Sequence, residues 1–169
     1  MVGYESPTGD IYEDFALKYG MDRTEAKGLV FKQLYGHIFD QYKDFEFFQL
    51  TQKLIEEIWN TFSKTGKYTV QETGKVFKKD DLTNMNPQKL FNYIIQHWET
   101  YNNVAILKEI LYIINNSETK LVLYTYDAFL LDISKQDKDK IRAILTVFND
   151  KKLKIKTSYG PNYDTLQPL

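Results

Sequence analysis

The sequence contains no cysteine and has only eight glycines and four prolines among its 169 residues. The absence of cysteine excludes disulfides, thiolate zinc sites and thiol nucleophiles. An excess of one charge is also lacking: 22 basic residues against 23 acidic ones give a net charge of -1. The whole chain therefore has no bulk attraction to nucleic acid or anionic lipid. Any site for a polyanion must be a local group of Lys and Arg.

Long apolar runs are missing as well. The longest, such as residues 110–114, span about five residues, whereas a membrane-spanning helix needs about 20. Residues 1–8 have neither a basic stretch nor an apolar core, so no signal peptide is visible. The hydrophobic fraction of 43% with 15% aromatics is sufficient for a packed core. We expect a soluble, cytoplasmic protein of about one domain.

The first half of the chain is predicted to be mainly helical. Apolar residues recur at helical spacing in three segments, each followed by a glycine: 10–19, 23–35 and 44–62. Residues 68–77 alternate and are rich in Thr, Val and Tyr, which predicts a strand pair. A longer helical pattern covers 90–114, and the Tyr-Asn-Asn sequence within 100–103 predicts a kink or break there.

The second half mixes strands with a helix. β-Branched and apolar residues predict strands at 121–125 and 129–133, joined by a tight turn at 126–128. A helix is predicted at 135–148, and alternation predicts a last strand at 153–157. A helical first half followed by a β–α–β second half indicates an α+β fold.

The second predicted helix carries a regular series of functional side chains. Arg23, Lys27, Phe31 and Tyr35 lie four residues apart, so they share one flank of the helix. The adjoining flank carries apolar residues that can anchor the helix to a core, namely Ala26, Leu29 and Val30. Two cations one turn apart near a helix N-terminus suit a triphosphate, and an aromatic ring further along can lie against its sugar or base. A solvated Arg and Lys beside two packed aromatic rings would give the same spacing.

The complete pattern, R-x3-K-x3-F-x3-Y followed by Gly36, resembles the nucleotide-binding helix of family A (DNA polymerase I family) DNA polymerases. Asp10-Ile11-Tyr12 resembles the D-I-[HY] segment that precedes this helix in the family. The resemblance implies that Arg23 and Lys27 neutralise the triphosphate of an incoming nucleotide, with Lys27 also counted as catalytic. It further implies that Phe31 lies against the sugar and base, and that Tyr35 and Gly36 shape the pocket for the nascent base pair.

A second signal is an acid between two apolar strands. Residues 121–133 read LVLYTYDAFLLDI, which places Asp127 at the turn. A carboxylate held at the tip of a hairpin is well placed to coordinate a divalent cation, although Asp is also among the commonest turn residues. The stretch resembles the second carboxylate motif of the same family, usually V-H-D-E. This implies that Asp127 is a catalytic Mg²⁺ ligand. Tyr126 and Ala128 replace the usual His and Glu, and phage-type members vary at these flanks.

Two weaker stretches follow in the order that the family has. The sequence 92–96 is similar to its N-x-x-I-Q element, which implies that Asn92 and Gln96 contact the primer–template DNA. Residues 153–163 resemble the closing strand and G-x-N-W tail, with Tyr163 in place of Trp. The resemblance thus divides the chain into an N-terminal tail (1–8), a fingers-like helical segment with a small β-hairpin (9–85) and a partial palm (86–169).

The other acid of a two-metal site is not recognisable in the sequence. Two-metal phosphoryl transfer needs carboxylates that hold both cations. In the family the first acid lies in a D-x-S-Q-x-E motif upstream of the nucleotide helix, and residues 1–8 do not contain one. We therefore expect a C-terminal part of a polymerase, cut from a longer chain or encoded separately, that is inactive alone. An uncovered sheet edge should bind a companion polypeptide with the remaining palm and thumb, or a second copy.

Two other interpretations stay open. The chain could be a remnant of the polymerase fold that binds nucleotide, nucleic acid or protein without turnover, or a structural α+β protein whose motif matches are accidental. If it is a polymerase part, Arg23, Lys27 and Phe31 should face the tip that bears Asp127. Two groups of lysines fit either a phosphate backbone or solvated surface: Lys64, Lys67, Lys75, Lys78 and Lys79, and Lys151, Lys152, Lys154 and Lys156.

Overall fold

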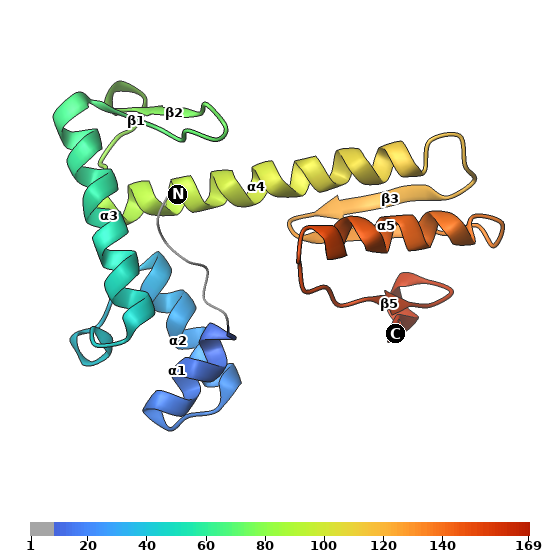
Figure 1. Cartoon of the computed structure of the whole chain (residues 1–169), viewed down its shortest axis with the longest axis horizontal. Coiled ribbons are helices and arrows are strands. Elements are labelled where there is room, and N and C mark those ends of the chain that lie inside the picture. The colour runs from blue at the N-terminus through green and yellow to red at the C-terminus, as the bar shows by residue number, and fades with distance from the viewer. Residues whose placement is uncertain (1–8) are drawn as a thin grey trace. The chain divides into compact units, whose positions relative to one another are not determined.

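The computed structural model describes residues 9–169 (Figure 1), so the predicted tail at 1–8 lies outside the described residues. The described residues divide into two compact units, one that ends at residue 97 and one that covers residues 98–169. Within the described part, three helices precede the first of several small antiparallel two-stranded sheets, and further helices lie between the sheets, which confirms the predicted α+β class. The helices are α1 (Ile11–Tyr19), α2 (Arg23–Tyr35), α3 (Glu46–Thr65), α4 (Pro87–Ile113) and α5 (Lys138–Asp150). The paired strands are β1 (Lys67–Thr69) with β2 (Val76–Lys78), β3 (Lys120–Thr125) with β4 (Ala128–Asp132), and β5 (Ser158–Tyr159) with β6 (Gln167–Pro168).

The first two helices begin where the sequence predicts them. The carboxylate of Asp10 accepts hydrogen bonds from the backbone N–H groups of Tyr12 and Glu13, which satisfies the open end of α1. Asp22 caps α2 in the same way. α1 and α2 pack against each other. α2 has the predicted bounds. Its N-cap residue and its regularly spaced apolar residues both indicate the same position for the helix.

An aromatic core holds this helix pair in place. Phe15 is fully buried, and its ring lies 5.1 Å from the rings of Tyr42 and Phe45. From α2, Ala26 and Val30 enter the same core, as their spacing predicts. Because the flank of α2 that carries Ala26 and Val30 packs into the core, the flank that carries Phe31 and Tyr35 is exposed to solvent.

α3 leads into the first hairpin. It ends at Gly66, which has a φ of +71°, a conformation that favours glycine. β1 and β2 then pair antiparallel, with Tyr68 opposite Phe77, which confirms the predicted strand pair. Phe77 is buried, and its ring lies 6.2 Å from that of His97 in α4.

The prediction within 100–103 was a kink or a break, and a break is wrong, because α4 runs as one helix through these residues. Asn costs a helix only about 0.5–0.7 kcal/mol relative to Ala, and tertiary packing overrides a penalty of that size. Ile94 is buried before the Asn pair, and Ile106 and Ile110 are buried after it. Asn103 also donates a side-chain hydrogen bond to the carbonyl of Tyr126, at 3.1 Å.

The second unit is built on the β3–β4 hairpin and two helical segments. Leu121, Phe129 and Leu131 pack against a core that contains Ile110 from α4 and Ile144 from α5. The ladder shifts register between Leu121 and Leu123, which leaves Val122 as an extra residue on β3. β3 and β4 pair only with each other, so both outer edges of this sheet are open within the described residues.

The strand predicted at 153–157 is also wrong. These residues form no ladder, and the only strands after α5 are β5 and β6 within the described part of the chain. A strand needs a hydrogen-bonded ladder as well as alternation. At this segment the one long-range backbone bond among the described residues is at its last residue, where the N–H of Leu169 donates to the carbonyl of Thr157 at 3.0 Å. Leu153 and Ile155 consequently stay exposed, at 44% and 39%.

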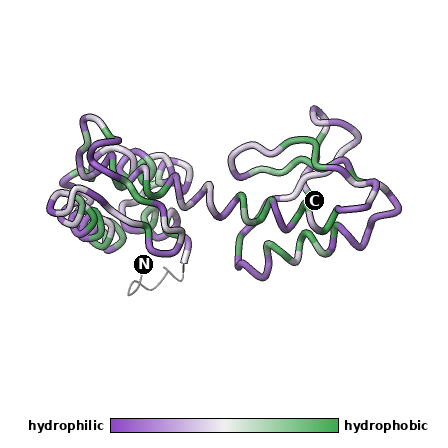
Figure 2. The backbone as a smooth tube through the Cα atoms, turned by 90° about the horizontal axis from the view of Figure 1, so that it is seen from above, coloured by the Kyte–Doolittle hydropathy of each residue, from purple (hydrophilic) through white to green (hydrophobic). Residues whose placement is uncertain are grey.

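Figure 2 shows that apolar stretches are interrupted by hydrophilic ones along the whole described trace. This pattern belongs to amphipathic elements with one buried side. In residues 9–169, no helix combines the length and the apolar character that crossing a bilayer requires.

Candidate functional site

The predicted functional flank of α2 is exposed and ordered as a row. Phe31 is 39% exposed and Tyr35 is 44% exposed, and their rings stack nearly parallel with centroids 6.0 Å apart. The ammonium of Lys27 lies 5.8 Å from the centroid of Phe31, a cation–π distance. The structure thus brings these three predicted residues together on one solvent-facing surface.

Tyr12 of α1 extends the row, although the sequence indicated it only as part of the segment before α2. Its ring stacks on Phe31 with a centroid separation of 6.2 Å. The guanidinium carbon of Arg23 lies 5.4 Å from the Tyr12 ring. We call the surface formed by Tyr12, Arg23, Lys27, Phe31 and Tyr35 the α2 face.

Arg23 is engaged by a carboxylate that sequence reasoning did not assign. Its Nη2 and Nε donate to Oδ2 of Asp10 at 2.6 and 3.2 Å. The hydrogen bond from Arg23 is the main cause that lowers the pKa of Asp10, and the same bond raises the pKa of Arg23. Among the described residues, Lys27 forms no ion pair. Lys27 is therefore the available cation of the α2 face, whereas Arg23 already has an anionic partner.

The C-terminal end of α2 is held by α4. Asn92 donates from Nδ2 to the carbonyl of Tyr35 at 3.0 Å, and Gln88 donates from Nε2 to the carbonyl of Leu34. Asn92, predicted to contact duplex DNA, thus positions α2, and its role toward DNA stays a prediction. Gln96 is exposed one turn further along α4.

Gly36 ends α2 at a point where a side chain does not fit. A Cβ at this position would lie 2.8 Å from the carbonyl oxygen of Lys32, which is closer than non-bonded atoms approach. The requirement for glycine next to Tyr35 therefore comes from the close approach of the helix backbone. Its predicted contribution to a base-pair pocket is a separate property that stays a prediction.

The second predicted element has the expected local form. Tyr126 and Asp127 form the two-residue turn between β3 and β4, and both are exposed. Tyr126 has a φ of +51°, an uncommon conformation for a residue other than glycine. The cross-strand rings of Tyr124 and Phe129 stack 5.1 Å apart just below this turn. A stacked pair next to the apex fixes the position of Asp127 relative to β3 and β4.

Asp127 and the α2 face belong to different units of the chain. The expectation that Arg23, Lys27 and Phe31 face Asp127 therefore stays a prediction. Within residues 9–169, no group of three His, Asp or Glu side chains is arranged to hold a metal ion. Mg²⁺ takes six ligands in near-octahedral geometry and often combines one or two carboxylates with phosphate oxygens and water. Asp127 fits one ligand position of a shared site and does not form a complete site alone.

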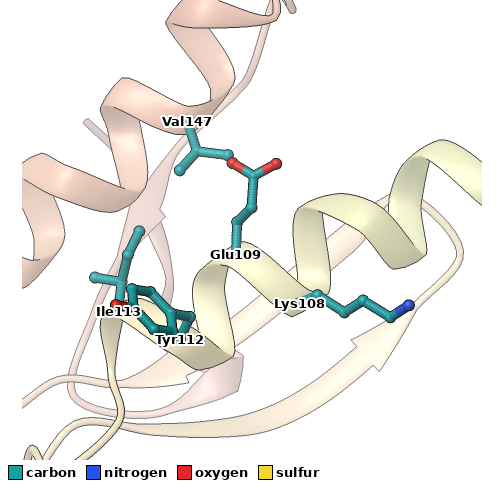
Figure 3. Close-up of a pocket in the computed structure, with 5 residues that line it drawn as sticks. All are labelled: Lys108, Glu109, Tyr112, Ile113 and Val147. Carbon is teal, nitrogen blue, oxygen red and sulfur yellow. The ribbon is translucent and has the colours of Figure 1, made fainter.

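A small groove lies elsewhere in the second unit. Its volume is about 310 Å³, and it lies between α4 and α5 (Figure 3). Glu109 points toward Val147 across the groove, while Lys108 points away from it. The Glu109 carboxylate also pairs with Lys151 at 2.8 Å. No predicted site residue lines this groove.

Comparisons with protein-family models, with curated proteins and with solved structures found no match to this chain.

Proposed function

We propose that this chain is the fingers and partial palm of a template-directed DNA polymerase of the DNA polymerase I family. In this proposal it acts in the cytoplasm, in DNA replication, together with a companion polypeptide. The proposal rests on the resemblance between the sequence of α2 and the nucleotide-binding helix of that family. The exposed α2 face is the observation that supports it most directly. A helix whose cations and aromatic rings were buried would not be available to a nucleotide.

The α2 face offers a triphosphate two kinds of contact. Lys27 lies in the second turn of α2, just after the positive N-terminal end of the helix dipole, and among residues 9–169 no carboxylate lies within ion-pair distance of it. Phe31 and Tyr35 present stacked rings that can lie against a sugar or base. Arg23 can join the phosphates only by sharing or leaving Asp10, because its guanidinium already binds that carboxylate.

The reaction in this proposal is attack of a primer 3′-hydroxyl on the α-phosphate of a bound nucleotide, with release of pyrophosphate. Mg²⁺, when bound, supplies charge neutralisation at the phosphates. From this chain, Asp127 would provide one carboxylate for that ion, and Lys27 and Arg23 would orient the triphosphate. Asn92 and Gln96 lie on α4 and would contact the duplex. The remaining carboxylate comes from the companion.

Open surface on the second unit supports the need for a companion. Val122 and Leu123 are 59% and 48% exposed on β3, and neither edge of the β3–β4 sheet is paired within the described residues. Unpaired edges next to apolar side chains favour association with another strand. Residues 153–157 alternate like a strand but also have no ladder.

The second candidate is a module that binds nucleotide or nucleic acid without turnover. The isolated position of Asp127 favours it, because one carboxylate does not complete a two-metal site. Both candidates predict nucleotide binding at the α2 face. They differ in whether a companion with the first acid restores primer extension.

The test is a titration of the chain with a fluorescent deoxynucleoside triphosphate in the presence of Mg²⁺. We expect saturable binding that Lys27→Ala weakens about tenfold, equivalent to about 1.4 kcal/mol, the size of a lost charge-assisted hydrogen bond. Lys53→Ala is the matched control, since Lys53 is an exposed lysine of α3 outside the α2 face. No binding by the wild-type chain, or equal losses in both variants, would contradict the proposal.

A further inference from the structure

The β1–β2 hairpin places two like charges directly opposite each other. Lys67 and Lys78 are register partners in the ladder, and both are exposed. Like charges at such positions destabilise a strand pair, because the facing Cβ atoms are only about 5 Å apart. Three more lysines lie on or next to this hairpin, and we call the five together the basic hairpin: Lys64, Lys67, Lys75, Lys78 and Lys79.

The ladder directs the lysine pair outward. Tyr68 and Phe77 form the next register pair, and Phe77 is buried near the ring of His97. Successive side chains of a strand point to opposite faces, so Lys67 and Lys78 lie on the face away from Phe77. The backbone N–H of Lys79 donates to the carbonyl of Gly66 at 2.9 Å, which continues the pairing by one step and keeps the lysines together.

The charge of the basic hairpin is not compensated by ion pairs. In the described part of the chain, none of its five lysines has a carboxylate within ion-pair distance. Lys75 instead lies over the ring of Phe77, at 5.7 Å. Asp80 and Asp81 follow β2 in the sequence, but within residues 9–169 neither carboxylate lies within ion-pair distance of these lysines. The lysine ammonium groups are therefore available to an external anion.

The other lysine group differs in this respect. Lys151 is neutralised by Glu109 at 2.8 Å, and residues 153–157 lack a ladder that would fix Lys154 and Lys156. The basic hairpin thus offers both the uncompensated charge and the rigid spacing. Lysine ammonium groups on a fixed backbone suit phosphate oxygens. They are compact point charges without the planar geometry of a side chain that distinguishes bases.

We propose that the basic hairpin binds the phosphodiester backbone of a nucleic acid, independently of base sequence. The inference takes the class of polyanion from the proposed function, and it adds a surface that uses neither the α2 face nor Asp127. Lys67 and Lys78 form its centre, and each neutralises one phosphate. Binding of two adjacent phosphates offsets the repulsion between the two lysines that the unbound ladder carries.

The test measures how salt weakens binding to a fluorescently labelled DNA duplex of about 20 base pairs, followed by anisotropy. Each neutralised phosphate contributes about -0.9 to the slope of log K against log salt. We expect the double variant Lys67→Gln/Lys78→Gln to reduce the magnitude of that slope by about 1.8, since two phosphate contacts are lost. Glutamine keeps most of the side-chain stem, so thermal melting should show a Tm equal to or above that of the wild type.

Lys135→Gln/Lys138→Gln is the matched control, because it removes the same charge from exposed positions in or just before α5. We expect the control to keep the wild-type slope. An unchanged slope in the hairpin variant, or an equal change in both, would overturn the proposal. Competition by polyglutamate as strong as by DNA of equal charge would overturn the choice of nucleic acid.

The outcome is separable from that of the proposed function. Triphosphate binding that depends on Lys27 tests the α2 face, whereas the salt slope tests the basic hairpin. A wild-type chain that binds triphosphate but no duplex would overturn only the present inference. A chain that binds the duplex through Lys67 and Lys78 but no triphosphate would overturn only the polymerase proposal.

Discussion

The guanidinium of Arg23 lies 2.6 Å from the same Asp10 carboxylate that caps the N-terminus of α1. One acid therefore closes one helix and binds the first residue of the next. This arrangement fixes Tyr12 beside Arg23, with the guanidinium carbon 5.4 Å from the ring. The aromatic row of the α2 face consequently begins on α1 rather than on α2 itself.

Asp10→Asn should lower stability at neutral pH and leave it nearly unchanged in acid. Arg23 lowers the pKa of Asp10 from its ordinary value of 3.8, so the ionised carboxylate stabilises the folded state. This stabilisation is complete at a pH above the pKa that Asp10 has in the unfolded chain. It disappears as the pH falls through the lower pKa that Asp10 has in the folded protein. Asn still caps a helix, so the variant isolates the ion pair from the cap. Urea unfolding of both proteins at neutral pH and over a series of acid pH values measures the difference.

The matched control is Asp22→Asn, because Asp22 caps α2 and forms no ion pair with any other described residue. A loss of stability in Asp10→Asn that persisted unchanged in acid would show that the ion pair is not its cause.

Tyr19 and Asp44 predict a second pH effect. The Tyr19 hydroxyl donates to Asp44 at 2.5 Å, and burial followed by this carboxylate raises the pKa of Tyr19 to about 12. A raised folded pKa means that the contribution to stability is complete below the ordinary pKa of 10.0 and is lost as the pH rises toward about 12. Asp44→Asn should therefore move the ultraviolet titration of Tyr19 to lower pH. A titration of Tyr19 that stayed in place would contradict the assigned contact.

Substitution of Phe15 and of Phe31 by alanine should reduce stability by different amounts, because Phe15 is a core residue and Phe31 lies on the α2 face. Phe15 is fully buried, so Phe15→Ala should cost about 3–5 kcal/mol of unfolding free energy. Phe31 is 39% exposed and makes stacked contacts, so Phe31→Ala should cost about 1 kcal/mol. Chemical denaturation gives both values. If Phe31→Ala unfolds the protein as strongly as Phe15→Ala, then Phe31 is a core residue and its role in the α2 face is wrong.

Two glycines should respond in opposite directions to alanine. Gly66 has a φ of +71°, where a Cβ is strained, so Gly66→Ala should destabilise by about 1 kcal/mol. Gly28 lies inside α2 without a positive φ, and an added Cβ meets no atom within 4 Å. Gly28→Ala should therefore stabilise by about 0.5–1 kcal/mol through helix propensity. Melting curves of the two variants check the pair, and a shift of the same sign in both would contradict the assigned backbone geometry.

Local patterns were sufficient to locate α2 and its exposed row. The cap at Asp22, the apolar flank through Ala26 and Val30 and the four-residue spacing all repeat within one helix, so no distant contact was needed. The partner of Arg23 was not predictable in the same way. Asp10 precedes Arg23 by a helix and a turn, and only the packing of α1 on α2 brings the two side chains together.

Errors arose where distant contacts outweigh local preference. Asn102 and Asn103 predicted a kink or break, but α4 has no break there, and isoleucines are buried on both sides of the pair. Residues 153–157 alternate like a strand, yet strand formation depends on a neighbouring chain segment that alternation does not reveal. The predicted approach of Asp127 to Lys27 depends on contacts between units, and it stays a prediction for the same physical reason.

The most direct test of a triphosphate site on the α2 face is an amide nitrogen–proton NMR titration of the labelled chain with Mg²⁺ and a deoxynucleoside triphosphate. We expect the largest chemical-shift changes to fall within residues 23–35 and at Tyr12, to saturate, and to disappear in Lys27→Ala. Shift changes confined to other segments, or identical changes in the wild type and Lys27→Ala, would contradict the triphosphate site.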